Sequence, residues 1–170
     1  MIILSLGSNL PSTFGDRFDN LKFAMSMLND YGIKIEKKSS FYETPSHPDK
    51  KQPKFINIII VVNTQLPVVD LMSVIIFIEE KLERKRNKKN DPRTCDIDII
   101  DYNHQVLDFK YKNLNLTVPH KKLIFRNFVL LPLKEICPDW FHPKTGKQID
   151  ELIAKLPDID KKSILKVNYN

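Results

Sequence analysis

Three short aliphatic runs, separated by segments of helical spacing, constrain the fold of this chain most. Residues 2–6, 55–64 and 94–102 are rich in isoleucine, valine and leucine, and runs of this length and composition are typical of buried strands. Between them, residues 14–29 and 67–82 place apolar side chains three or four positions apart, which predicts two amphipathic helices. The chain is therefore expected to mix a sheet with helices.

The order of the remaining segments favours an α+β fold. Residues 33–42 alternate apolar and polar side chains over part of their length, and residues 106–120 contain a hairpin-like segment. A third helix is predicted over 127–136. Because the elements follow one another in the order β-α-β-β-α-β, we expect a ferredoxin-like three-layer α/β/α sandwich with a mainly antiparallel sheet.

The chain length sets the number of domains. Its 170 residues, 42% of them hydrophobic, are enough for one ordinary core, so we expect one domain over residues 1–160. Residues 161–170 are expected to be a terminal tail or the start of a linker. Within the domain, residues 43–54 form a long connection with three prolines, and such loops are usually lids, binding segments or disordered stretches.

The composition also narrows the cellular setting. No run approaches the roughly 18 apolar residues of a membrane span, and the first residues lack the charged start and cleavage site of a secretion signal. We therefore expect a cytoplasmic protein that does not act on membranes. Cys95 and Cys137 lack metal-binding spacing, and a reducing compartment disfavours a disulfide, so both are expected to be ordinary thiols.

The basic charge is concentrated in one segment. The formal net charge is +6, and residues 84–93 (RKRNKKNDPR) hold six bases against a single acid. Such a segment could bind nucleic acid, an anionic membrane surface or a small phosphate-bearing molecule. Nucleic-acid surfaces usually interleave bases with aromatic residues, but no aromatic residue lies between Phe77 and Tyr102. The distribution favours the small phosphate-bearing ligand.

Two aspartates follow this basic segment. Asp96 and Asp98 lie two residues apart in the strand predicted over 94–102, so their side chains share one face while Ile97 and Ile99 point into the core. An isolated Asp-x-Asp pair is more often a solvated strand face. Arg93 and the bases before it change this balance, because phosphate chemistry needs both a metal and cationic neutralisation. We interpret the pair as a Mg²⁺ site.

Other polar and aromatic residues could complete a binding site, but each could also have a purely structural role. Gly7 lies between a strand and a helix, where the backbone could approach a ligand, or where a tight turn is simply required. His120 and Arg126 could contact phosphate, although a lone histidine is more often structural. Phe55 and Phe128, with an amide such as Asn57, suit a flat heterocycle, although core packing is the default for phenylalanine.

Several motifs, taken together, resemble one enzyme family. They are GSNL at 7–10, SSFYETP at 39–45, PKFIN at 53–57, E-x-x-x-x-R-x-R at 79–86, PRTCDIDI at 92–99, VPH at 118–120 and R-x-F at 126–128. In this order they resemble the 6-hydroxymethyl-7,8-dihydropterin pyrophosphokinase family over residues 1 to about 155. The resemblance implies transfer of the β,γ-pyrophosphoryl group of ATP to the hydroxymethyl group of the dihydropterin, in folate biosynthesis.

The resemblance also implies roles for individual residues. Asp96 and Asp98 would be ligands of two Mg²⁺ ions on the ATP phosphates and, with Arg84 and Arg93, would form the catalytic set. The residues implied to contact ATP are Glu79, Arg84, Arg86, Arg93, Ile99, Thr117, His120 and Arg126. Those implied to line the pterin slot are Thr44, Pro45, Phe55, Asn57 and Phe128. Members of the family are sometimes fused to neighbouring folate enzymes, which residues 161–170 could continue into.

The sequence departs from the family pattern in the basic segment. That segment is one residue shorter than in well-known bacterial members, and Asn90 and Asp91 stand where they often carry a tryptophan. We expect a less hydrophobic closed state in which Lys88 or Lys89 contacts phosphate. His47 has no assigned role. Two rival functions remain at this point, a basic nucleic-acid-binding module and a regulatory nucleotide sensor, but neither needs the full set of pterin residues.

Overall fold

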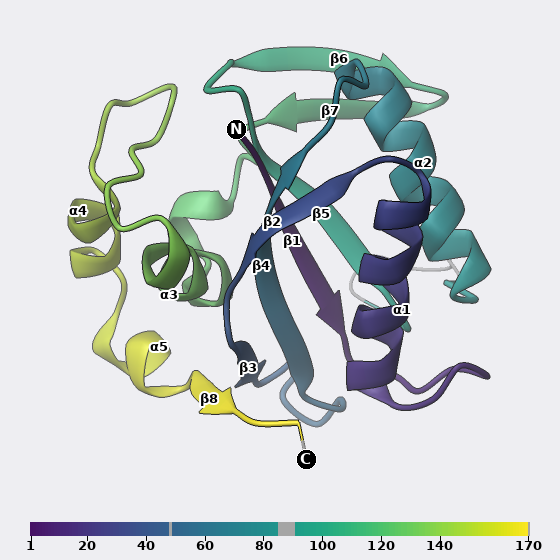
Figure 1. The fold of residues 1–170 in the computed structure, drawn as a ribbon. Coiled ribbons are helices and arrows are strands. Elements are labelled where there is room, and N and C mark those ends of the chain that lie inside the picture. The colour runs from purple at the N-terminus through teal and green to yellow at the C-terminus, as the bar shows by residue number, and fades with distance from the viewer. Residues whose placement is uncertain (48, 85–90, 170) are drawn as a thin grey trace.

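The structure, a computed structural model, describes residues 1–47, 49–84 and 91–169 and shows one α+β sandwich (Figure 1). Its strands are β1 (Ile2–Ser8), β2 (Lys34–Lys38), β3 (Phe41–Thr44), β4 (Phe55–Asn63), β5 (Asp96–Tyr102), β6 (Leu107–Tyr111), β7 (Leu114–Val118) and β8 (Leu165–Val167). Its helices are α1 (Arg17–Asp30), α2 (Val68–Lys81), α3 (Asn127–Ile136), α4 (Ile149–Ala154) and α5 (Asp158–Lys162), with a 3₁₀ turn, η1 (Leu123–Phe125). The expected fold class is confirmed.

The main sheet has the strand order β5-β1-β4-β3-β8, and β2 also pairs with β4. The pairings of these strands are all antiparallel. β1 lies between β4 and β5, with Gly7 opposite both Asn57 and Asp96. β6 and β7 form a separate antiparallel hairpin, as the sequence predicted for this region. The register therefore brings segments from three distant parts of the sequence side by side.

Local chemistry fixes where the first two helices begin. The side chain of Asp16 accepts hydrogen bonds from the backbone N–H groups of Phe18 and Asp19, and the side chain of Asp19 accepts one from the backbone N–H of Asp16. This capping box starts α1 at Arg17, three residues later than the apolar spacing predicted. α2 begins directly after Pro67, a position where the missing N–H of proline leaves no helix bond unmade.

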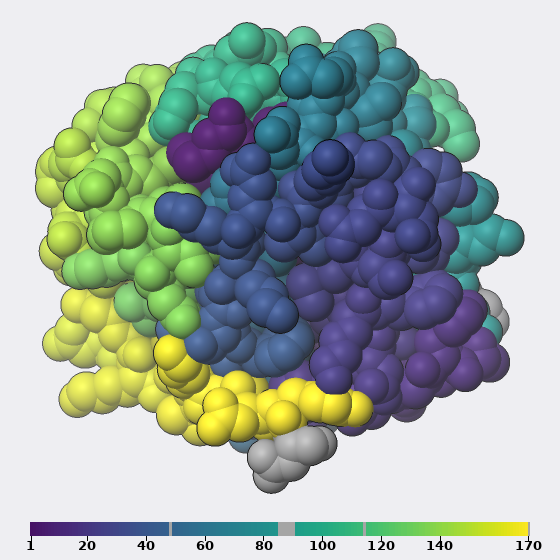
Figure 2. All heavy atoms as spheres, viewed as in Figure 1, coloured from purple at the N-terminus to yellow at the C-terminus, as the bar shows by residue number. Residues whose placement is uncertain are grey.

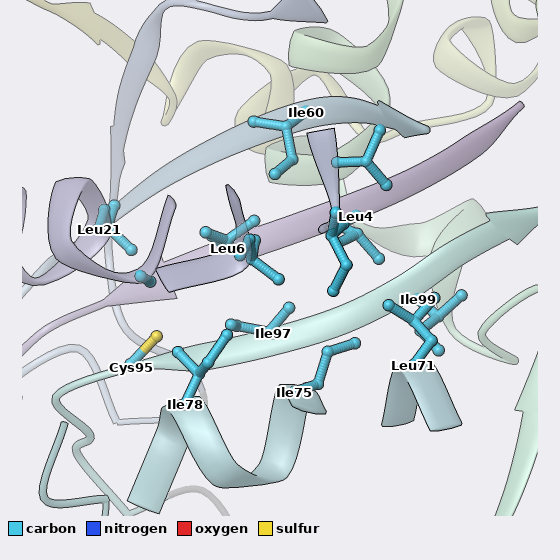
Figure 3. Packing of buried hydrophobic residues seen from close by; sticks show 14 of the residues in the cluster. Leu4, Leu6, Leu21, Ile60, Leu71, Ile75, Ile78, Cys95, Ile97 and Ile99 are labelled. Carbon is cyan, nitrogen blue, oxygen red and sulfur yellow. The ribbon is translucent and has the colours of Figure 1, made fainter. Parts of the chain in front are cut away.

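Two hydrophobic cores lie on opposite faces of the sheet, which confirms the three-layer arrangement. In the first core, α1 and α2 pack against β1, β4 and β5, and Figure 3 shows Ile97 and Ile99 directed toward Leu71, Ile75 and Ile78 of α2. In the second core, α3 and α4 cover the other face and meet the alternate side chains of the same strands. The layers thus follow from the alternation of side chains along each strand.

The C-terminal segment contains structure that the sequence analysis did not predict. Within residues 161–170, where a terminal tail or the start of a linker was expected, α5 is followed by β8, which pairs with β3. Beyond β8, the ring of Tyr169 lies 3.1 Å from Lys22 Nζ and its hydroxyl donates to Asp19 at 2.8 Å. Figure 2 shows this segment crossing the surface toward α1. The expectation of a tail is therefore wrong for residues 165–167, which form a strand. The domain boundary at residue 160 stays a prediction.

No helix within the described ranges is long and apolar enough to cross a membrane. Cys95 and Cys137 are both buried free thiols, in agreement with the expectation from the sequence.

Candidate active site

The site lies on the face of the sheet that carries the second core, at the end that this core leaves uncovered. Along β1 this face changes from the apolar Ile3 to Ser5 and Gly7, and the paired strands change with it. Ser5 stands opposite Asp98, and Gly7 stands opposite Asp96 on one side and Asn57 on the other. Small and polar side chains on three adjacent strands therefore form one patch.

Gly7 leaves the space that Asn57 occupies. A Cβ atom added at Gly7 would lie 3.1 Å from Asn57 Oδ1 and 3.6 Å from Cδ1 of Phe55. The amide of Asn57 is also held from β3, because its Nδ2 donates to Thr44 Oγ1 at 3.0 Å and to the Tyr42 carbonyl at 3.3 Å. The predicted pterin residues Thr44, Phe55 and Asn57 are thus brought together on neighbouring strands.

Arginines from three segments surround the two aspartates. Asp96 Oδ1 lies 2.7 Å from Arg84 Nη1, and Asp96 Oδ2 lies 2.8 Å from Arg93 Nη1. Asp98 Oδ2 lies 2.6 Å from Arg126 Nη1. Within the described residues, the two carboxylates therefore pair with three arginines, and these predicted charged residues lie in one cluster.

Glu79 anchors this cluster from α2. Glu79 is 1% exposed, and its carboxylate accepts hydrogen bonds from the Ile97 backbone N–H at 2.8 Å and from Arg84. A buried carboxylate is costly unless it is paired, and here both a strand N–H and a guanidinium pair with it. Glu79 therefore fixes Arg84 beside Asp96 and ties α2 to β5.

Burial and neighbouring charges shift the pKa values of three groups in the cluster. Burial alone raises the pKa of Asp98, but Arg126 and His120 outweigh it, so this pKa lies below the usual value of an aspartate. Burial lowers the pKa of His120 even though Asp98 opposes the change. Burial likewise opposes ionisation of Arg84, but Asp96 and Glu79 raise its pKa. At neutral pH we expect an ionised Asp98 beside a neutral His120.

Two of the arginines also lie against the predicted pterin aromatics. The guanidinium carbon of Arg93 is 5.7 Å from the ring centroid of Phe55, and that of Arg126 is 5.5 Å from the ring centroid of Phe128. Each of these arginines therefore stands between a carboxylate and an aromatic ring. This geometry joins the predicted pterin side of the site to the predicted phosphate side.

The remaining predicted site residues lie in other elements or outside the described residues. Ile99 packs in the first core, on the sheet face opposite Asp98 (Figure 3). Thr117 lies in the β6–β7 hairpin, where its hydroxyl donates to Asp108 at 2.6 Å. Pro45 directly follows β3, and Arg86 lies outside the described residues, as do Lys88 and Lys89. The ligand contacts of all these residues stay predictions.

Asn9 has a larger structural part than sequence reasoning gave it. The GSNL segment suggested only a tight turn, yet Asn9 is 1% exposed and its side chain contacts two other loops. A single sequence carries no signal for these partners, since they lie about 40 and 80 positions away along the chain.

A comparison with family models decides what kind of protein this is. The model described as 7,8-dihydro-6-hydroxymethylpterin-pyrophosphokinase (HPPK) matches residues 3–138. The chain belongs to the HPPK family. The resemblance predicted from the motifs is thereby confirmed, and the motifs from GSNL to R-x-F fall within the matched residues.

Relatives of this HPPK chain include separate enzymes and longer proteins. The 2-amino-4-hydroxy-6-hydroxymethyldihydropteridine pyrophosphokinase of Synechocystis sp. is 36% identical over 155 residues, which are 91% of this chain and 75% of the relative. The enzyme of the same name from Bacillus subtilis is 33% identical over 149 residues, 87% of this chain and 84% of the relative. The folic acid synthesis protein fol1 of Schizosaccharomyces pombe is 36% identical over 155 residues, and the match covers 91% of this chain but only 20% of that protein.

Solved structures support the fold of this HPPK chain. A crystal structure of Plasmodium falciparum HPPK-DHPS matches with a TM-score of 0.78 at 16% identity, covering 99% of this chain and 46% of that one. At this identity the match concerns the fold alone. A folate synthesis bifunctional protein of Arabidopsis thaliana is also similar, and the match covers 79% of this chain but only 26% of that protein.

The donor atoms of the site fit Mg²⁺. Asp96 and Asp98 offer hard carboxylate oxygens from a rigid strand. Within the described residues, no group of three or more histidine, cysteine, aspartate or glutamate side chains could hold a metal ion by itself. Mg²⁺ is commonly held by one or two carboxylates, with substrate phosphates and water as its other ligands. The pair is therefore the kind of site that binds Mg²⁺ together with a nucleotide.

Proposed function

We propose that this chain transfers the β,γ-pyrophosphoryl group of ATP to the hydroxymethyl group of 6-hydroxymethyl-7,8-dihydropterin. The products are AMP and the pterin diphosphate, an intermediate of folate biosynthesis. Membership of the HPPK family supports the reaction. The observation that carries it in the structure is the row of arginines that links Asp96 and Asp98 to Phe55 and Phe128.

On the nucleotide side, the carboxylates and arginines exchange partners when substrate binds. Asp96 and Asp98 would hold two Mg²⁺ ions, which supply neutralisation of the phosphate charge. Arg84, Arg93 and Arg126 then turn from the carboxylates to phosphate oxygens, which a guanidinium binds through paired hydrogen bonds. Burial lowers the pKa of His120, which favours its neutral form, so it would donate one hydrogen bond to a phosphate without adding charge.

On the acceptor side, the aromatic rings and the amide hold the pterin. The flat ring lies between Phe55 and Phe128, and Asn57 reads its polar edge. Thr44 and Pro45 form the wall at the end of β3. Phe55 and Phe128 each lie near an arginine of the phosphate side, which supports a pose in which the hydroxymethyl group is directed toward the β-phosphorus.

The reaction itself needs positioning and charge neutralisation rather than a covalent intermediate. The pterin hydroxyl oxygen forms a bond to the β-phosphorus, and the bond from that phosphorus to the oxygen bridging to the α-phosphorus breaks, so AMP leaves. The hydroxyl proton passes to Asp98 or to water. Asp98 is the candidate because, as a predicted metal ligand, it would be the carboxylate nearest to both the substrate and a metal ion.

The test is the identity of the nucleotide product. AMP should form from ATP only when 6-hydroxymethyl-7,8-dihydropterin is added, whereas ADP as the product would mean an ordinary kinase. Asp96→Asn and Asp98→Asn should each lower kcat by about a hundredfold or more. The matched control is Asp139→Asn at an exposed position, which should leave kcat unchanged. Normal turnover of Asp98→Asn at saturating Mg²⁺ would remove both its metal and its proton role.

Two finer assignments remain predictions in this proposal. The lid formed by the basic segment rests on Arg84 within the described residues and on Arg86, Lys88 and Lys89 outside them. Replacing Lys88 and Lys89 together should weaken ATP binding, and an unchanged affinity would exclude their contact with phosphate. The cytoplasmic location likewise rests on the sequence.

A further inference from the structure

Thr94 carries a buried hydroxyl that has no hydrogen-bond partner in the protein. The residue is 8% exposed, and among the described residues its Oγ1 is the buried side-chain oxygen or nitrogen atom that lacks a partner. Other buried hydroxyls are paired, as Ser39 Oγ is with the Ser40 carbonyl at 2.8 Å. Because burying a hydroxyl without a partner costs free energy, this group requires a functional or structural explanation that can be tested.

Thr94 lies between two residues of the charged cluster. Arg93 directly precedes it, and Asp96, which pairs with the Arg93 guanidinium at 2.8 Å, follows two positions later. Cys95 and Ile97, on either side of Asp96, pack in the first core. Since neighbouring side chains of an extended chain alternate between faces, Thr94 is expected on the same face as Asp96. That face of the sheet carries the proposed active site.

The main chain beside Thr94 lies close to the acceptor side of that site. The Arg93 carbonyl accepts a hydrogen bond from the backbone N–H of Asn9 at 3.0 Å. The side chain of Asn9 in turn donates to the carbonyl of Pro53 at 3.0 Å, two residues before Phe55. The guanidinium carbon of Arg93 also lies 5.7 Å from the ring centroid of Phe55. Thr94 is therefore next to the predicted pterin slot.

We propose that Thr94 is a further substrate-binding residue, and that its hydroxyl forms a hydrogen bond with a polar atom of the bound dihydropterin. The inference rests on the proposed function, which puts the pterin against Phe55. A pterin offers ring nitrogens, a carbonyl and an amino group, and a hydroxyl can rotate to serve as donor or acceptor. The hydroxyl is unpaired within the protein and paired in the complex, which favours binding.

This role predicts opposite effects of Thr94→Val on stability and on binding. The substitution keeps the branched shape of the side chain and replaces the hydroxyl with a methyl group. In the free protein it removes an unpaired polar group, so the Tm should rise by about 3 °C. In the complex it removes a hydrogen bond, so the Kd for the pterin should rise by about tenfold. A purely structural hydroxyl would instead give a lower Tm and an unchanged Kd.

The experiment combines thermal melts of the ligand-free full chain with calorimetry. The full chain is titrated with 6-hydroxymethyl-7,8-dihydropterin at saturating Mg²⁺ and α,β-methylene analogue of ATP, and separately with the Mg²⁺ complex of that analogue alone. In Thr94→Val the Kd for the analogue should change by less than about twofold, because the lost bond belongs to the pterin. Thr94→Ser keeps the hydroxyl and should keep the Kd for the pterin within about threefold of wild type.

Ser39→Ala is the matched control for loss of a buried hydroxyl. Ser39 is 5% exposed, and its Oγ donates to the Ser40 carbonyl and accepts from the Ile59 backbone N–H at 3.0 Å. Removing this paired hydroxyl leaves buried groups without partners, so the Tm should fall while the Kd values for the pterin and the analogue stay unchanged.

An unchanged Kd for the pterin in Thr94→Val would overturn the inference, as would a fall in the Tm of this variant. An equal loss of affinity in Thr94→Ser would also overturn it, and so would a loss for the analogue as large as the loss for the pterin. If the wild-type chain binds neither ligand and releases no AMP, the proposed function fails and the inference fails with it. If wild type binds both ligands and releases AMP, a negative result concerns Thr94 alone.

Discussion

At the scale of single residues, the polar patch on the sheet face of the second core depends on the missing side chain of Gly7. Gly7 has no side chain between Asn57 and Asp96, so the strands beside it can present an amide and a carboxylate at the same level. Glycine is normally unfavourable within a strand, because it packs nothing and loses more freedom on folding. Its place in β1 is therefore explained by the site rather than by the stability of the sheet.

Gly7→Ala tests this interpretation. The new Cβ would lie 3.1 Å from Asn57 Oδ1, so the amide must move by a few tenths of an ångström. We expect the KM for the pterin to rise by about tenfold, which corresponds to about 1.4 kcal/mol, with a change of less than about 1 kcal/mol in the free energy of unfolding.

A double-mutant cycle identifies the cause of that loss. If crowding of Asn57 is responsible, Gly7→Ala should have almost no further effect on the KM in an Asn57→Ala background, because residues in contact are not additive. Additive losses in the double mutant would instead mean that Gly7 acts independently of the amide.

The same scale shows what strand alternation can predict. Asp96 and Asp98 were placed on one face, and Ile97 and Ile99 in the core, from a period of two alone, and the burial of the two isoleucines agrees. The pairing of each aspartate with a particular arginine could not be derived in this way, because Arg126 reaches Asp98 across 28 positions of sequence. Such pairings depend on tertiary structure.

At the scale of elements, long periodic segments were predictable and short ones were not. The helix over 127–136 and the strands near 2–6 and 55–64 agree with α3, β1 and β4, because each buries a continuous apolar stripe. β8 has only three residues and Leu165 is largely exposed. Its stability comes from pairing with β3, which no local pattern encodes.

Glu135 in α3 connects this region to the sheet. Its carboxylate accepts from Ser40 Oγ at 2.7 Å and Tyr42 Oη at 2.8 Å, and Lys166 Nζ lies at 3.2 Å. Burial acts to raise the pKa of Glu135, but these donors outweigh it, so the pKa is lowered. Burial and Glu135 together raise the pKa of Tyr42 to about 12. One carboxylate thus links α3, β3 and β8.

Glu135→Gln should therefore destabilise the protein in a pH-dependent way. Charge-assisted hydrogen bonds contribute about 1–2 kcal/mol here. Because the folded pKa is lowered, this contribution is present above the unfolded pKa of about 4.3 and is lost as the pH falls through the folded value. Urea unfolding across pH 3–7 should show wild type and variant converging in acid. Glu36→Gln, at an exposed position of β2, is the control and should show no such convergence.

At the scale of the whole molecule, the protein carries a net charge of +6, and its proposed substrate ATP is a polyanion. Electrostatic attraction between such partners is screened by salt. The KM for ATP should rise by about tenfold between roughly 0.05 and 0.5 M ionic strength. Steady-state kinetics at a fixed Mg²⁺ concentration measure this change.

The uncharged pterin provides an internal reference for that titration. Its KM should change by less than about twofold over the same range, because screening acts only on charge. If both KM values rise together, salt is affecting the fold rather than the attraction of ATP.

The pairing of β8 with β3 has a further consequence for how this molecule behaves in concentrated solution. An unpaired strand at the edge of a sheet offers N–H and C=O groups to the sheets of other molecules, which is a common route to aggregation. β8 covers β3 over Phe41 to Glu43 and, being only three residues long, leaves little edge of its own. At this edge of the sheet, β8 therefore leaves less of β3 open to pairing with another molecule.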